Sequence, residues 1–110
     1  MDQAGPWSEV SPSVVSLVAQ IRALPGHEAE VESMLAQYGK TVRQEAGNRI
    51  FAVNKSADDS HLFVVYEEYA SQEAFQAHLR AEYGAVFNTA LAPLVVGGRS
   101  ELQMLQPVLP

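Results

Sequence analysis

Hydrophobic positions with a period of two recur in four segments of the chain. The first three segments are rich in β-branched or aromatic residues and are bounded by turn-forming residues, a pattern that is typical of β-strands, whereas the fourth alternates only loosely. We predict strands over residues 13–24, 48–55, 61–69 and 101–108. The short segment between the second and third strands, which contains Asp58 and Asp59, predicts that these two strands form an antiparallel hairpin.

Helical periodicity marks two other segments. Apolar residues recur at i, i+3, i+4, i+7 and i+11 from Val31, which predicts a helix over residues 27–46. Acidic residues crowd the start of this helix and basic residues lie near its end, as the helix dipole favours. A second helix is expected to begin at Ser71, because serine is a favoured N-cap. We expect a bend or split in it near Gly84.

The resulting order, β-α-β-β-α-β, predicts an α+β fold of the ferredoxin-like kind. In this fold an antiparallel four-stranded sheet carries both helices on one face. Every predicted strand offers apolar side chains to both faces, so the open face needs a cover. A second copy is the simplest cover, and we expect a homodimer through the open sheet face.

Residues 13–110 are predicted to form one domain. Residues 1–12 are predicted to be a flexible arm, in which Trp7 is either a loose aromatic or an interface anchor.

Composition narrows the possible functions. The chain is 47% hydrophobic and 18% charged, which is ordinary for a globular domain. It has no cysteine, which excludes disulfides, thiolate metal sites and a cysteine nucleophile. A net charge of -6 argues against nucleic acid or an anionic membrane as a partner. No apolar run could span a bilayer, and the start of the chain does not resemble a signal peptide, so we expect a cytoplasmic location.

Two titratable side chains stand out on otherwise apolar surfaces. Glu67 shares a strand face with apolar residues, whereas Glu68 points to the other face. His78 lies on the apolar stripe of the second helix, which would carry it toward one of these two carboxylates. Each has a structural alternative. His78 would then be a core histidine, and Glu67 would pair with Arg22 or Arg49 across the sheet.

Several segments together resemble a known family. They are Leu24-Pro25-Gly26, Glu45-Ala46-Gly47, Tyr66 through Ser71, Glu73 through Leu79, and Phe87 through Leu94. In order and spacing they are similar to the antibiotic biosynthesis monooxygenase (ABM) domain, which includes quinol monooxygenase-like proteins of the dimeric alpha/beta barrel superfamily. The resemblance implies a dimer with a pocket between sheet and helices. It also implies a small-molecule substrate, which several members oxidise with O2 and without a metal or flavin.

The resemblance also separates branches of the family. Glu67 and His78 match the family pattern, but Phe51 stands where a tyrosine is frequent. The haem-degrading branch carries an asparagine, a tryptophan and a histidine ligand at three places. This chain has Ala19, Tyr69 and Asn88 there, so haem degradation is not expected.

A metal-independent oxygenase needs a base, a hydrogen-bond donor and a dry apolar pocket. We predict His78 as the base, Glu67 as its orienting group or as the base itself, and Tyr69 as a donor to a substrate oxygen. The predicted pocket walls are Phe51, Phe63, Val65, Phe75, Tyr83 and Phe87. The three histidines show no metal-ligand spacing, and we expect neither metal nor cofactor. The expected substrates are O2 and a small aromatic quinol or related enolisable compound. An isomerase with the same pocket and a non-catalytic ligand-binding dimer are the alternatives.

Overall fold

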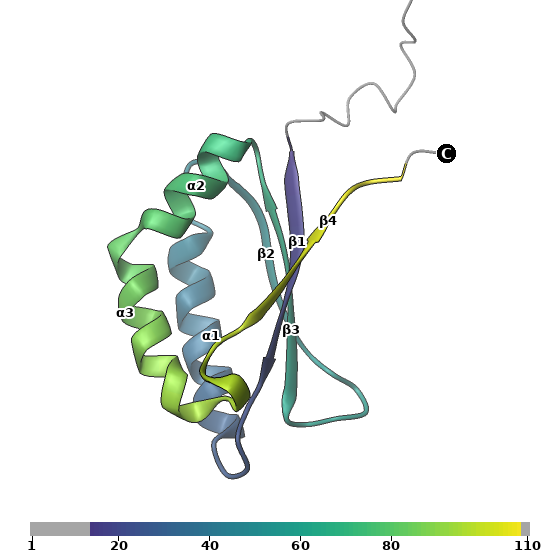
Figure 1. The fold of residues 1–110 in the computed structure, drawn as a ribbon, viewed down its shortest axis with the longest axis vertical. Helices are drawn as coiled ribbons and strands as arrows, with labels where there is room; N and C mark the ends of the chain where they lie inside the picture. The colour runs from purple at the N-terminus through teal and green to yellow at the C-terminus, as the bar shows by residue number, and fades with distance from the viewer. Residues whose placement is uncertain (1–13, 109–110) are drawn as a thin grey trace, which may run out of the picture.

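The structure, a computed structural model, describes residues 14–108. Its elements follow one another along the chain in the colour order of Figure 1. They are β1 (Val15–Arg22), α1 (Glu28–Val42), β2 (Asn48–Lys55), β3 (Leu62–Tyr69), α2 (Gln72–Arg80), α3 (Glu82–Leu91), the 3-10 turns η2 (Ala92–Leu94) and η3 (Val96–Gly98), and β4 (Glu101–Leu105). The predicted arm over residues 1–12, with Trp7, lies outside the described residues.

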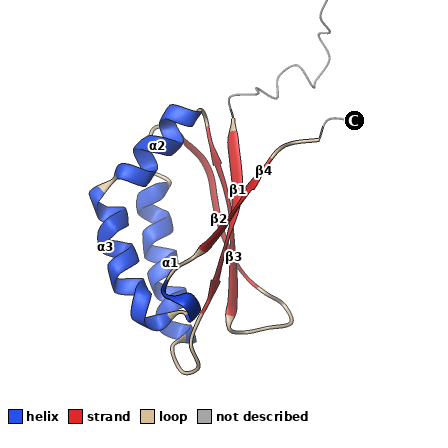
Figure 2. Cartoon of the chain, viewed as in Figure 1, coloured by secondary structure: helices blue, strands red, loops and turns tan. Residues whose placement is uncertain are grey.

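The four strands form one antiparallel sheet in the order β2-β3-β1-β4. All three helices lie on the same side of the sheet, and the other side is left open within the chain (Figure 2). The predicted ferredoxin-like α+β fold is therefore confirmed, with β3 in the middle of the sheet between β1 and β2. The hairpin between β2 and β3 is also confirmed, with a register irregularity between Asn48 and Ile50.

The second helix splits at Ala81 rather than at the predicted position near Gly84. Ala81 has extended backbone angles (φ -64°, ψ 133°) and separates α2 from α3. Gly84 is buried inside α3, where a Cβ would lie 3.4 Å from the Tyr38 hydroxyl. Gly84 therefore packs beside α1 with helical backbone and does not mark the change of chain direction.

The first helix ends earlier than predicted, at Val42. Its N-cap is His27, which makes no side-chain capping bond. Beyond Val42 the chain continues in tight turns, in which the Gln44 and Glu45 backbone N–H groups bond to carbonyls three residues earlier. These turns carry Glu45 away from the helix axis.

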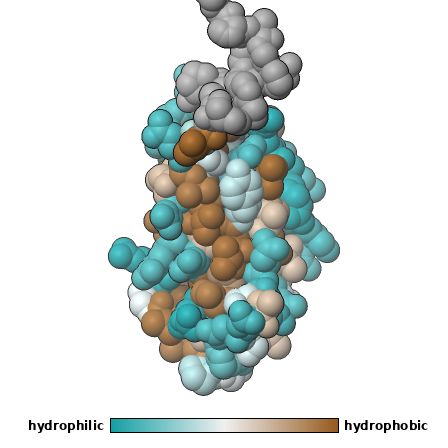
Figure 3. Space-filling model, turned by 90° about the vertical axis from the view of Figure 1, so that its right-hand side faces the viewer, coloured by the Kyte–Doolittle hydropathy of each residue, from teal (hydrophilic) through white to brown (hydrophobic). Residues whose placement is uncertain are grey.

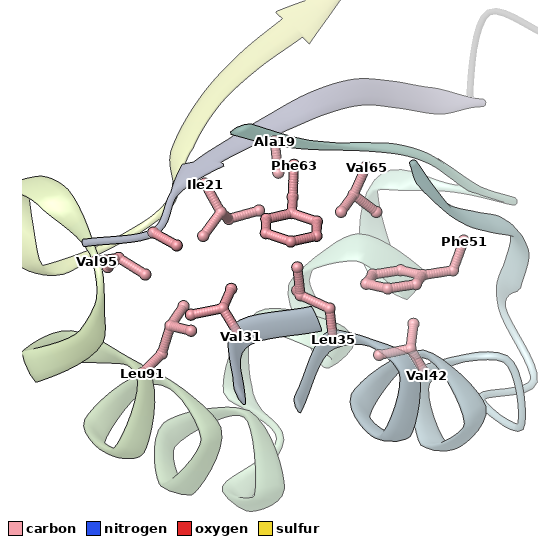
Figure 4. Packing of buried hydrophobic residues seen from close by; sticks show 11 residues of the cluster. Ala19, Ile21, Val31, Leu35, Val42, Phe51, Phe63, Val65, Leu91 and Val95 are labelled. Carbon is pink, nitrogen blue, oxygen red and sulfur yellow. The ribbon is translucent and has the colours of Figure 1, made fainter. Parts of the chain in front are cut away.

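The main core lies between the inner sheet face and the helices (Figure 4). Strand alternation supplies one wall, because successive side chains point to opposite faces. The helices supply the other wall. The buried members include Ala19, Ile21, Val31, Leu35, Val42, Phe51, Phe63, Val65, Leu91 and Val95. A smaller cluster at the end of the sheet near α2 contains Leu17, Tyr69 and Phe75.

The open face of the sheet carries a band of apolar residues that runs along its length (Figure 3). In β3 the side chains of this face are only partly buried, while those of the helical face are buried. All five residues of β4 are exposed, including Leu105 at 38%. In the part of the chain that the structure describes, no helix has the length and hydropathy needed to cross a membrane.

Candidate active site

A cavity of about 90 Å³ lies between the inner sheet face and the helices. Four of the predicted wall residues line it, namely Phe51, Val65, Phe75 and Phe87. Phe63 is instead packed in the core at 1% exposure. Tyr83 lies beside the cavity, where it packs against Tyr38 and reaches Glu45. The space is small beside the roughly 300–1,000 Å³ of typical ligand pockets.

Glu67 faces this cavity from β3 and is 6% exposed. One carboxylate oxygen, Oε1, accepts a hydrogen bond of 2.7 Å from the Tyr69 hydroxyl. The two arginines considered as its partners are engaged elsewhere. Arg22 pairs with Asp59 at 2.7 Å, and Arg49 lies 3.8 Å from Glu68. Strand alternation thus places Glu67 inside and Glu68 on the open face.

Burial dominates the protonation of Glu67. Loss of water raises the pKa of its carboxyl group above the ordinary value, against the lowering effects of the Tyr69 hydrogen bond and of His78. Burial also raises the pKa of the Tyr69 hydroxyl, with a further rise from the Glu67 charge. Tyr69 is fully buried and donates its proton to Glu67. Its hydroxyl therefore holds the carboxylate in place instead of pointing at the cavity.

His78 enters the cavity from α2 and is 9% exposed. The start of this helix is fixed by Ser71, whose hydroxyl accepts a 3.1 Å hydrogen bond from the Ala74 N–H. One turn further on, the imidazole Nδ1 lies 2.9 Å from Glu45 Oε2. A carboxylate at Nδ1 holds the proton on that nitrogen and leaves Nε2 as the basic atom.

Glu45 is the site residue that sequence reasoning did not single out. It lies in the turn before β2, and Tyr83 of α3 also donates a hydrogen bond to its Oε2. Glu45 thus joins side chains from two helices, 33 and 38 residues away in sequence. The only sequence signal was its place directly before Ala46-Gly47, in one of the segments that resemble the family.

Aromatic rings surround the imidazole. The ring of Tyr69 has its centroid 4.9 Å from that of His78, and Tyr38 lies 6.3 Å away. Tyr38 stacks on Phe87 with centroids 3.9 Å apart. Burial, with the nearby charges of Glu67 and Glu45, raises the pKa of Tyr38 to about 12. Its hydroxyl therefore stays protonated at neutral pH. The sequence pattern marked Tyr38 only as part of the apolar stripe of α1.

The mouth of the cavity is formed by residues that are exposed or only partly buried. Leu79 and Leu102 line it at 52% and 50% exposure, together with Asn88 and Ser100.

The other two histidines lie elsewhere. His27 is close to Glu30, and His61 pairs with Glu28. Within residues 14–108, no group of three or more potential ligands is arranged to hold a metal ion.

The fold and the site define a class: a small α+β domain with a histidine–carboxylate pair in an apolar cavity. A family model described as antibiotic biosynthesis monooxygenase matches residues 14–90. The chain therefore belongs to the ABM family. A comparison with curated proteins found no match.

Several solved structures have the same fold. PA3566 from Pseudomonas aeruginosa is 26% identical, with a TM-score of 0.80 over 88% of this chain and 96% of that one. Rv0793 from Mycobacterium tuberculosis is 21% identical, with a TM-score of 0.80 over 89% and 98%. A mutant of SnoaB from Streptomyces nogalater, called a cofactor-independent oxygenase, is 20% identical, with a TM-score of 0.78 over 89% and 96%.

Proposed function

We propose that this protein is a cofactor-independent monooxygenase that acts on a small aromatic quinol or a related enolisable compound. The observation that carries the proposal is the His78–Glu45 pair. It fixes a histidine with a free Nε2 at the wall of an apolar cavity. The family and the name of the SnoaB structure support the same class of reaction.

The reaction begins with removal of a proton. Nε2 of His78 accepts the proton of a substrate hydroxyl, and the resulting anion is electron-rich enough to pass one electron to O2. The radical pair recombines to form a carbon–oxygen bond, and the imidazolium returns its proton to the peroxide. The carbon that carries the hydroperoxide then loses its hydrogen as a proton, and the O–O bond breaks to leave a C=O group. The outer oxygen leaves as water with that proton and the proton returned by the imidazolium. The substrate thus performs the redox chemistry, and the protein supplies the base and a site that excludes water.

Glu45 and Tyr83 act on this step through His78. The Glu45 carboxylate stabilises the imidazolium that forms when Nε2 is protonated, and Tyr83 fixes the carboxylate by donating to the same oxygen. Glu67 lies on the opposite wall with a raised pKa. Its second oxygen, Oε2, accepts a hydrogen bond from another hydroxyl of the substrate, and Tyr69 keeps the carboxylate oriented.

A second candidate function is isomerisation without O2. It is favoured by the presence of a base, His78, and a carboxyl group of raised pKa, Glu67, on one cavity. Such a pair can take a proton from one substrate atom and deliver another elsewhere. A non-catalytic ligand-binding dimer would use the same cavity without either step.

We further propose that the protein works as a homodimer in the cytoplasm. The apolar band on the open sheet face supports a second copy as its cover (Figure 3). The helical face holds the cavity, so this mode of association leaves one cavity in each subunit.

The direct test is O2 uptake by metal-free protein in the presence of a chelator. Hydroquinones, naphthohydroquinones and anthrone-like compounds are compared, with autoxidation subtracted. The proposal predicts protein-dependent uptake that saturates with one of these classes. Absence of uptake, together with solvent deuterium exchange into the substrate under anaerobic conditions, would instead establish the isomerase.

A further inference from the structure

The charges around the cavity are all negative or neutral. Its lining contains one carboxylate, Glu67, and one histidine, His78, and a second carboxylate, Glu45, stands behind the imidazole. No lysine or arginine is among the lining residues that the structure describes. An anionic group inside this cavity would meet two carboxylates without a cation to offset them.

The mouth offers no cation either. Its lining side chains are apolar or neutral. Arg80 and Arg99 are sequence neighbours of mouth residues, but both are exposed. Arg99 lines a separate hollow that also contains Arg22 and Glu101. The lining does contain neutral donors, namely Tyr38, Asn88 and Ser100. An anionic substituent therefore gains no cationic partner from the lining, whichever end of the substrate carries it.

Two acceptor atoms on the cavity lack a hydrogen-bond partner within residues 14–108, namely His78 Nε2 and Glu67 Oε2. In the same part of the chain, no inaccessible side-chain nitrogen or oxygen is left without a partner. Both atoms must therefore retain accessible surface, although their residues are 91% or more buried. Both residues line this cavity, and His78 also lines a hollow beside Glu45. The carboxylate of Glu67 is thus the acceptor that the cavity presents to its occupant.

We infer that the cavity selects a neutral substrate that donates hydrogen bonds through ring hydroxyls, and that it rejects carboxylated, phosphorylated or sulfated analogues. The inference rests on the proposed function for the reaction, but its recognition step is independent of O2. A hydroxyl donates to Nε2 or Oε2, whereas an anionic group brings only further acceptors and a repelled charge. Glu67 is the residue that sets this preference.

Anaerobic binding of matched probes tests the inference. The probes are 1,4-dihydroxybenzene against 2,5-dihydroxybenzoate, and 1,4-dihydroxynaphthalene against 1,4-dihydroxy-2-naphthoate, measured by calorimetry at neutral pH. In at least one pair the neutral probe should bind ten times or more tighter than its carboxylate. Glu67→Gln should narrow that ratio, because it removes one negative charge at constant shape. Glu73→Gln, which removes an exposed acid from α2, the helix that carries His78, should leave the ratio unchanged.

The outcomes separate this inference from the proposed function. Equal or tighter binding of the carboxylates, or no binding of any probe, would overturn the inference. A ratio that Glu67→Gln leaves unchanged would also overturn the role of Glu67. The neutral probe could bind selectively and yet not react with O2. That result would support the binding preference and contradict the oxygenase activity.

Discussion

Burial and hydrogen bonding have opposite effects on the pKa of the Glu67 carboxyl group. Desolvation raises its pKa, and the bond from Tyr69 opposes the rise. Because the folded-state pKa lies above the unfolded value, the protonated group stabilises the fold at acid pH. This stabilisation is lost as the pH rises through the folded-state pKa. The buried carboxylate is thus a cost in stability that the site carries at neutral pH.

Glu67→Gln removes this ionisation and keeps the acceptor for Tyr69. We therefore expect the variant to melt at a higher temperature than the wild type at pH 7–8, with the difference shrinking toward pH 4. For a domain of this size each kcal/mol moves Tm by about 4–8 °C. Thermal melts across pH 4–8 provide the measurement, with Glu73→Gln as the exposed control. A difference that stays constant over this range would contradict the raised pKa.

The sequence patterns predicted some residues of the site but not others. Strand alternation put Glu67 and Glu68 on opposite faces of β3 but left open which of them faces the cavity, whereas periodicity put His78 on the apolar stripe of its helix. Neither pattern could supply Glu45, because it lies 33 residues from His78 in a turn without periodicity. The sequence also could not predict that the Tyr69 hydroxyl donates to Glu67, because the direction of a hydroxyl depends on its partner in the folded structure.

At the scale of elements, the start of α2 fixes where His78 lies. Ser71 caps the helix through the Ala74 N–H, and His78 follows two turns later. Removing the cap leaves a backbone donor without its partner. The position of the imidazole against Glu45 therefore depends on a single hydroxyl at the helix end.

Ser71→Ala should destabilise the protein by about 1 kcal/mol, the usual cost of losing an N-cap. Ser33→Ala is the matched control, because Ser33 is exposed in the interior of α1 and alanine is the better helix former there. Urea denaturation of both variants measures the difference. Equal stabilities of the two variants would contradict the capping role.

The order and type of the elements followed from periodicity, but several boundaries did not. The first helix ends at Val42 because a series of three-residue turns replaces its hydrogen bonds, although the residues up to Ala46 are compatible with a helix. The second helix breaks at Ala81 because its backbone is extended there, and alanine gives no sequence signal for such a break.

At the scale of the whole molecule, one face of the sheet is covered by helices and the other is open. The helices bury one face, while the other carries the apolar band of Figure 3. Val64 lies on this open face in the middle of the sheet, paired in register with Gln20 of β1 and Asn54 of β2. In the proposed dimer it lies under the partner subunit.

Val64→Lys should weaken the dimer about 10²–10⁴-fold, because an unpaired buried charge costs about 3–5 kcal/mol. Val86→Lys is the control, since Val86 is 70% exposed on α3. Light scattering after size exclusion over a range of concentrations measures the mass of each variant. A wild type that has the mass of one chain at all concentrations would refute the dimer itself.

The central claim is that His78, held by Glu45, is the base that starts the oxygenation. The most direct measurement is the rate of O2 uptake by His78→Gln beside His27→Gln, with the best quinol substrate found for the wild type. His27 is a half-exposed histidine at the start of α1, away from the cavity. The account predicts a loss of about 10²–10⁴-fold in kcat for His78→Gln, the usual contribution of a general base, and little change for His27→Gln. Wild-type kcat in a folded His78→Gln protein would contradict the account.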